Sequence, residues 1–213
     1  MPIVDKVLQD AAELLNDPNH ERWTYANLVE WVNAGCVAAC EIKPTLYVVK
    51  DELPLVEGAV QTLGDEHTLL VRALYTKLNG SVGGGGPGPG PSGSLGKTPL
   101  AADLATVTTV DPYWMTATPD DEIDEIMYDP QTPRTFYVSP PQPSSGVNYL
   151  YAEVATVPPF KLPNEEIPIP HIYAPALVDY VLWRAYSMDA EHASQDGRAA
   201  VHYNTFKAAI LGQ

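Results

Sequence analysis

Residues 174–188, APALVDYVLWRAYSM, and residues 24–43, TYANLVEWVNAGCVAACEIK, decide the fold of this chain. In both stretches the hydrophobic side chains recur every three or four residues, which gathers them on one face of an α-helix. Pro175 falls in the first turn of the later stretch, where proline is tolerated. Thr24 is a suitable N-cap for the earlier stretch, and Pro44 closes it. The two stretches therefore predict amphipathic helices near both ends of the chain.

Each of these predicted helices has a helical neighbour in the sequence. An earlier helix is expected over residues 2–15, until Asn16, Asp17 and Pro18 end it. A last helix is expected over residues 198–211, after a break at residues 194–197. Two amphipathic helices joined by a short loop must bury their apolar faces against something else. We therefore expect the two hairpins, residues 1–45 and 171–213, to pack together as a helical bundle.

The middle of the chain is rich in proline, with 17 of the 21 prolines between Pro87 and Pro175. Proline breaks helix interiors and removes a donor from strands, so short strands and loops are expected here. Residues 80–98 are rich in Gly, Pro and Ser and predict a long flexible loop. The fold class is therefore α+β, with residues 46–170 as a β-rich, proline-rich insertion. Strands or β-rich segments are expected over residues 46–49, 53–63, 68–78, 105–110, 135–139 and 149–157.

The charge balance excludes a general binder of the nucleic-acid backbone. The 213 residues hold 27 acidic and 12 basic side chains, for a formal charge of −15, whereas phosphate binding needs a basic face. The apolar stretches are shorter than the roughly 18–20 residues that cross a bilayer, and the N-terminus lacks the pattern of a signal peptide. Two cysteines fit a reducing compartment. We expect no contact with a membrane.

Two glycine motifs resemble phosphate-binding loops. Gly88, Gly90 and Gly93 match G-x-G-x-x-G, and residues 96–98 read Gly-Lys-Thr. Both motifs bind phosphate only when they open a helix, and Pro99 opposes a helix here. We interpret both as parts of the flexible loop.

The sequence shows no pattern of catalytic or metal-ligating residues. Cys36 and Cys40 lie on the apolar stripe of a predicted helix and are expected to be buried thiols, because a zinc site needs a second pair of ligands. The five histidines are scattered, and no nucleophile, base and orienting group can be placed together. We expect no enzymatic activity, no cofactor and no metal.

A run of acidic residues precedes the segment MYDP at residues 127–130. It lacks the residue order of a calcium-binding loop, so a solvated acidic face is favoured over a cation site. The run consists of Asp120, Asp121, Glu122, Asp124 and Glu125.

Several segments together resemble one protein family. IYAPALVDYVLWRAYS at residues 172–187 is the most specific, and RWT at 22–24, LVEWVNAG at 28–35, MYDP at 127–130 and RTFYV at 134–138 occur in the same order. The chain resembles the head–tail adaptor proteins of tailed bacteriophages, which are related to tubular tail proteins. Its Gly/Pro loop and its acidic run depart from the pattern of that family.

The resemblance implies a structural virion protein at the head–tail junction, assembled in the host cytoplasm. Such proteins form a homo-oligomeric ring, typically of twelve copies, below the portal protein. They join the capsid to a tail-side neck, tail tube or nozzle protein, and they continue the channel through which double-stranded DNA passes. A closed ring needs two different contact patches on each subunit, and a negative channel wall repels phosphates.

Three groups of residues are the candidates for these roles. The acidic run 120–125 is expected to contribute to the negative field of the channel. A loop of the composition of residues 80–96 needs a neighbour to order it. Aromatic and arginine side chains are typical anchors of interfaces. Packing in the helical core explains the aromatic side chains equally well. The interface candidates are Gly83, Gly86, Pro89 and Gly93 in the loop, and Tyr173, Trp183, Arg184 and Tyr186 near the C-terminus.

Two other classes of function remain open from the residues. The first is an acidic mimic of DNA that sequesters a host DNA-binding protein, although residues 171–213 are nearly neutral. The second is a nucleotide-binding assembly factor that uses residues 96–98.

Overall fold

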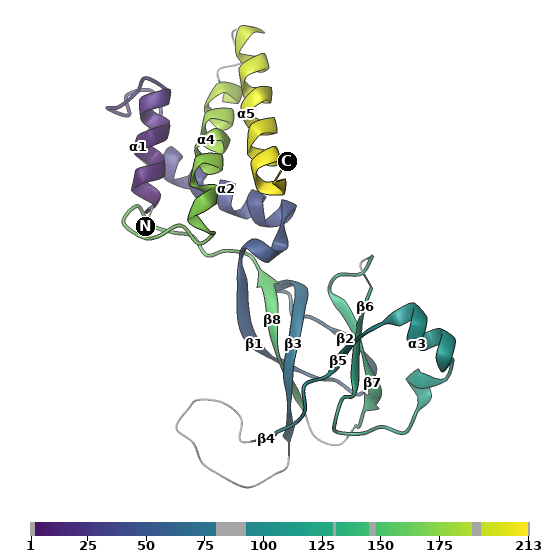
Figure 1. Ribbon diagram of the computed structural model, residues 1–213. Helices are drawn as coiled ribbons and strands as arrows, with labels where there is room; N and C mark the ends of the chain where they lie inside the picture. The colour runs from purple at the N-terminus through teal and green to yellow at the C-terminus, as the bar shows by residue number, and fades with distance from the viewer. Residues whose placement is uncertain (1–2, 80–92, 130, 145–147, 189–192, 213) are drawn as a thin grey trace. The chain divides into compact units, whose positions relative to one another are not determined.

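The computed structural model describes residues 3–79, 93–129, 131–144, 148–188 and 193–212. The chain has a mixed α+β fold, as predicted, with five α-helices and two four-stranded sheets in the described ranges (Figure 1). It forms two compact units. Residues 1–47 and 157–213 make a helical unit, and residues 48–156 make a β unit.

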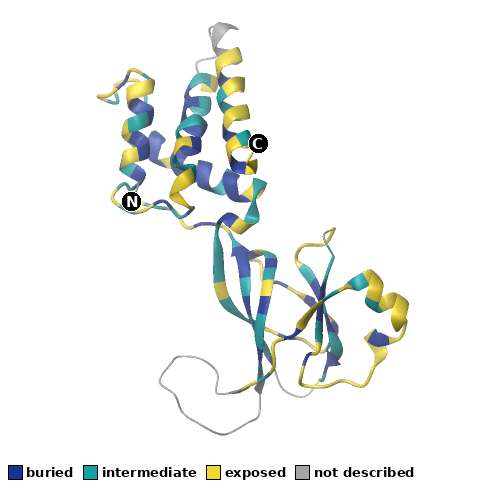
Figure 2. Cartoon of the chain, viewed as in Figure 1, coloured by how far each residue is buried: buried dark blue, intermediate teal, exposed yellow. Residues whose placement is uncertain are grey.

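The helical unit is built from four helices that share one hydrophobic core. Helix α4 packs against α1, α2 and α5. All four helices contribute buried residues to the shared core, and Figure 2 colours the buried residues dark blue. Phe206, Leu8, Leu28 and Leu177 are almost completely buried in this core. The helices are α1 (Val4–Leu14), α2 (Tyr25–Ile42), α4 (Ala174–Met188) and α5 (Ala193–Leu211).

Local signals explain where these helices begin and end. The Thr24 side chain accepts a hydrogen bond from the Asn27 backbone N–H, so it caps α2 as predicted. Asn16 has a φ of 54°, in the left-handed region that ends many helices. After it, the buried Asp17 carboxylate accepts backbone hydrogen bonds from Glu21, Arg22 and Trp23, which holds the turn between α1 and α2.

The β unit contains two sheets with a core of their own. In one sheet the strands run in the order β1-β8-β3-β4, all antiparallel. In the other the order is β2-β7-β6-β5, where only β5 and β6 are parallel. The strands are β1 (Val48–Pro54), β2 (Gly58–Thr62), β3 (His67–Asn79), β4 (Gly93–Leu95), β5 (Leu100–Asp103), β6 (Glu125–Tyr128), β7 (Thr135–Gln142) and β8 (Tyr149–Thr156).

The structure corrects four predictions. Residues 105–110 were expected as a strand but lie in α3 (Leu104–Val110), because Asp103 caps a helix there. The predicted strand at residues 46–49 begins only at Val48, after a 3-10 turn over Pro44–Leu46. Residues 194–197, expected as a break, belong to α5. Residues 157–170, assigned to the insertion, lie in the helical unit, where Ile167 and Ile169 are buried.

The end of the predicted flexible loop is also ordered. Residues 93–95 form β4 and pair with the end of β3, and Gly96 donates a backbone hydrogen bond to Thr76. Gly83, Gly86 and Pro89 lie outside the described residues.

Candidate functional site

The acidic run forms an exposed turn that leads into β6. Asp120, Asp121, Glu122 and Asp124 are exposed, and Glu125 is half-buried. Ile123 in the middle of the run is completely buried in the core of the β unit. The run therefore has one apolar anchor, and its carboxylates lie at the surface as predicted for a solvated face.

Polar contacts fix the shape of this turn. The Asp120 side chain accepts a hydrogen bond from the Glu122 backbone N–H at 3.0 Å. The Asp121 carboxylate accepts one from the Asn148 amide at 3.0 Å, and Gln142 donates to the Asp120 carbonyl. Asn148 and Gln142 are buried, so the acidic turn rests on a buried polar support.

Lys97 forms ion pairs with two of these carboxylates. Its ammonium contacts Asp124 and lies 3.5 Å from Glu122. The hydrogen bond to Asp124 raises the pKa of Lys97, which keeps this lysine charged. The turn with its lysine keeps a net charge of −4, because one cation accompanies five acids.

The Gly-Lys-Thr segment is extended rather than a phosphate-binding loop. The Thr98 hydroxyl donates a hydrogen bond to the Leu74 carbonyl of β3, and the Lys97 carbonyl accepts one from the Thr76 backbone. Strand β5 follows after Pro99, where a phosphate-binding loop requires the N-terminus of a helix. This geometry gives no support to nucleotide binding through residues 96–98.

Cys36 and Cys40 are buried on α2, as predicted. Burial raises the pKa of Cys36 to about 12 and that of Cys40 to about 11, so both remain protonated thiols at neutral pH. Among the described residues, no group of three His, Cys, Asp or Glu side chains is arranged to hold a metal ion.

The aromatic residues near the C-terminus pack against the helical core. The Trp183 ring lies 5.0 Å from that of Tyr180 and 4.6 Å from that of Tyr203, and the Arg184 guanidinium lies over it. Tyr173 also packs against this core. Tyr186 stacks on His202, whose Nδ1 lies 2.7 Å from an Asp179 carboxylate oxygen. Packing explains these positions, and their role in an interface stays a prediction.

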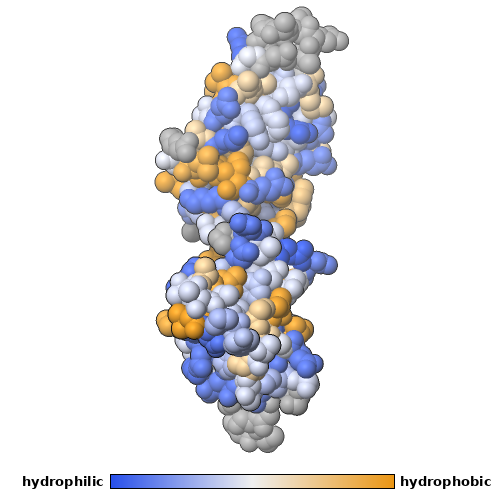
Figure 3. Space-filling view, turned by 90° about the vertical axis from the view of Figure 1, so that its right-hand side faces the viewer, coloured by the Kyte–Doolittle hydropathy of each residue, from blue (hydrophilic) through white to orange (hydrophobic). Residues whose placement is uncertain are grey.

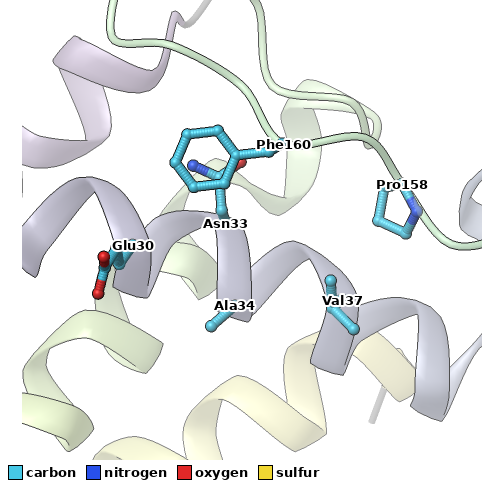
Figure 4. Close-up of a pocket in the computed structure, with 6 residues that line it drawn as sticks. All are labelled: Glu30, Asn33, Ala34, Val37, Pro158 and Phe160. Carbon is cyan, nitrogen blue, oxygen red and sulfur yellow. The ribbon is translucent and has the colours of Figure 1, made fainter.

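The surface of α2 carries a depression that the sequence did not reveal. It has a volume of about 400 Å³ and lies between α2 and the segment around Phe160 (Figure 4). Phe160 at its rim is 59% exposed. The lining is mainly apolar, so the depression offers a contact surface rather than reactive groups. Its lining residues are Glu30, Asn33, Ala34, Val37, Pro158 and Phe160.

Asn33 fastens this segment to α2. Its side-chain amide donates to the Lys161 carbonyl at 3.0 Å, and its side-chain oxygen accepts from the Lys161 backbone N–H at 2.6 Å. A further hydrogen bond joins the amide to the Val29 carbonyl within α2. Figure 4 shows Asn33 reaching from the helix toward the segment that carries Phe160.

No helix in the described parts of the chain has both the length and the apolar character needed to span a membrane. No curated protein matches the sequence. The family model described as SU10 adaptor protein matches residues 4–213, which is nearly the whole chain and includes both units. The chain therefore belongs to the SU10 adaptor proteins, a family of phage head–tail adaptors, and is a structural component of the virion.

Proposed function

We propose that this protein forms a ring, typically of twelve copies, below the portal of a tailed phage. The ring joins the capsid to the tail-side neck, tube or nozzle protein and continues the DNA channel at the head–tail junction. The observation that carries this proposal is the family match over residues 4–213. Membership of an adaptor family implies contacts with portal and tail components.

The division into two units supports this role. Each unit has a separate hydrophobic core, so each can present its own contact surface without depending on the packing of the other. A protein that joins two different partners needs at least two such surfaces.

The acidic turn supports passage of DNA without adhesion. A formal charge of −15 repels phosphates in general, and the exposed carboxylates of residues 120–125 are candidates for the channel wall. The variant Glu122→Gln/Asp124→Asn/Glu125→Gln removes three charges while leaving Asp120 and Asp121 in their turn contacts. We expect slower DNA ejection from virions that carry it.

The matched control neutralises three exposed acids of the helical unit, as Glu21→Gln/Glu30→Gln/Glu41→Gln. If virions that carry the first variant eject DNA at the normal rate, the proposed position of residues 120–125 in the channel wall is contradicted. Equal slowing by both variants would assign the effect to net charge rather than to this turn.

The Gly/Pro loop and the C-terminal aromatic residues remain candidates for contacts within the ring. A deletion of residues 83–92 removes the candidates Gly83, Gly86 and Pro89 but spares β4, which pairs with β3. We expect this deletion to weaken ring assembly, and normal assembly would count against a role for the loop.

A genetic experiment tests the function as a whole. Phage that lack this gene should accumulate DNA-filled heads and separate tails, and expression of the protein in trans should restore infectious particles. Tailed particles formed without the protein would contradict the proposal.

A further inference from the structure

Helix α5 has a second face that no part of the described structure covers. Its inner face packs through Ala199, Phe206 and Ile210, which are buried. On the opposite side, Val201 is 62% exposed and Leu211 is 49% exposed. A surface helix of a monomeric protein normally carries charged residues on its outer side. Figure 3, viewed from the side on which α5 lies in Figure 1, shows hydrophobic surface exposed on the helical unit.

Two cations flank this outer face of α5. Arg198 and Lys207 are exposed, and residues 197–212 contain no Asp or Glu in a chain of charge −15. The Lys207 ammonium lies over the Tyr203 ring at 5.6 Å. Within the described ranges, neither cation pairs with a carboxylate. The outer face of α5 therefore carries exposed apolar side chains beside the exposed polar residues Asn204 and Thr205, and it is positive at its flanks.

The outer face of α1 has the opposite charge. Glu13 is exposed, and Leu14 beside it is 62% exposed. Asp10 forms an ion pair with Lys6, the one cation of the helix. Asp5 accepts hydrogen bonds from the Gln9 amide and the Tyr25 hydroxyl. Helix α1 thus has a net charge of −2 and carries a large apolar side chain at the surface.

These two faces lie at opposite edges of the helical unit. Helix α4 packs against both α1 and α5, and Figure 1 shows α4 between them. A ring closes through heterologous contacts, in which one patch of a subunit meets a different patch of the next. Opposite charges on two edges favour contact between different edges and oppose contact between identical ones.

We propose that the outer face of α5 in one copy of this chain docks against the outer face of α1 in the next copy. This inference rests on the proposed ring and specifies its subunit contact. Val201 and Leu211 meet the apolar side of α1 around Leu14, and Arg198 and Lys207 face the acids of α1.

Two variants with exchanged charges test the contact. Variant A carries Gln9→Lys/Glu13→Lys on α1, and variant B carries Arg198→Glu/Lys207→Glu on α5. Each alone places like charges at every subunit contact, and ring formation on the purified portal should fall. One exposed ion pair contributes up to about fivefold in affinity. Each variant removes two such pairs, so it weakens each contact by up to about 25-fold and affects all contacts of the ring.

An equimolar mixture of A and B should restore the rings. In an alternating ring the positive α1 of A meets the negative α5 of B, and the unchanged edges meet each other. The control Glu57→Lys changes an exposed acid of the β unit, and it should leave assembly unaltered. All substituted side chains are exposed, so the helical circular dichroism and urea midpoint should match those of the wild type.

A covalent test adds a second readout. The double variant Glu13→Cys/Val201→Cys should yield a ladder of disulfide-linked oligomers when rings are mildly oxidised. The pair Glu57→Cys/Val201→Cys should remain monomeric.

Each outcome of these experiments decides the inference. Loss of rings with A and with B, recovery in the mixture and a covalent ladder support the contact. Rings that form normally with A and B overturn the edge contact but leave the proposed ring intact. Failure of the wild-type protein to form a ring on the portal overturns the proposed function, and the edge contact with it.

Discussion

Replacement of Asn33 by alanine should strongly destabilise the helical unit. The substitution removes the two hydrogen bonds to the Lys161 backbone and the one to the Val29 carbonyl. Asn33 is only 7% exposed and Lys161 is half-buried, so the Lys161 backbone groups lose their partners in a partly buried place. Each buried polar group left without a partner costs about 1–3 kcal/mol. We therefore expect the free energy of unfolding to fall by about 2–4 kcal/mol.

Urea denaturation followed by circular dichroism at 222 nm measures this change, because the long helices belong to the helical unit. With a denaturant slope of about 1.5–2 kcal/mol/M, the urea midpoint of Asn33→Ala should fall by roughly 1–2.7 M. The matched control is Asn204→Ala on α5, where the asparagine is exposed. That variant should retain the wild-type midpoint or slightly exceed it, since alanine favours helix.

A midpoint of Asn33→Ala equal to that of Asn204→Ala would refute this reasoning. It would mean that the segment around Lys161 is held by its other contacts, and that Asn33 only satisfies its own polar atoms.

Four further substitutions test the packing and electrostatics of the helical unit. Gly35→Ala should lower the free energy of unfolding by about 1 kcal/mol, because the added Cβ lies 3.1 Å from the buried Tyr180 ring. Gly197→Ala should raise the free energy of unfolding by about 0.5–1 kcal/mol, because its added Cβ has no atom within 4 Å. Phe206→Ala should cost about 3–5 kcal/mol in urea denaturation, because the ring is completely buried. Asp17→Asn should lower the urea midpoint at pH 7 by more than at acid pH.

The pH dependence of the Asp17 effect follows from its hydrogen bonds. The backbone N–H of Trp23, followed by those of Glu21 and Arg22, lowers the pKa of this carboxyl below its usual 3.8. A group with a lowered folded-state pKa stabilises the protein fully above its unfolded pKa. That stabilisation is lost as the pH falls through the lowered value. The difference between wild type and variant should therefore be large at pH 7 and should shrink at the acid end; a difference independent of pH would contradict this assignment.

For the glycine and Phe206 substitutions, the following results would contradict the predictions. Equal effects of Gly35→Ala and Gly197→Ala would show that the space around the two glycines does not govern their substitution. A change below about 1 kcal/mol for Phe206→Ala would mean that the core collapses around the removed ring.

Local sequence signals located helices α1, α2 and α4 well. The helix over residues 174–188 has the predicted bounds, and Thr24 caps α2 as predicted. The strand expected over residues 149–157 is present as β8, one residue shorter. Periodicity and capping depend on neighbours within a few positions, so a single sequence contains them.

Helix α3 shows where local propensity misleads. Its sequence LATVTTV is rich in β-branched residues, which favour strands. The Asp103 carboxylate accepts hydrogen bonds from both the backbone N–H and the hydroxyl of Thr106, and this cap favours the helix. The sequence signal for this helix was Asp103, a possible N-cap, three positions before Thr106. No residue of α3 is buried, so the helix has no buried face that would give its sequence a helical periodicity of hydrophobic residues.

The contacts within the candidate surfaces could be identified only from the structure. The exposure of the acidic run was predictable from its charge, but its pairing with Lys97 joins residues 27 positions apart. Asn33 and Lys161 are 128 positions apart, so no local pattern could connect them. The charges of α1 and α5 were visible in the sequence, whereas their positions on either side of α4 follow only from the packing of the helices.

The most direct test of the central claim is to mix the purified protein with the portal ring of the same phage and image the product by electron microscopy. We predict a second ring stacked coaxially on the portal, with a copy number that can be counted from its symmetry. Intact portal rings with no added density, in the presence of folded protein, would contradict the assignment as the adaptor below the portal.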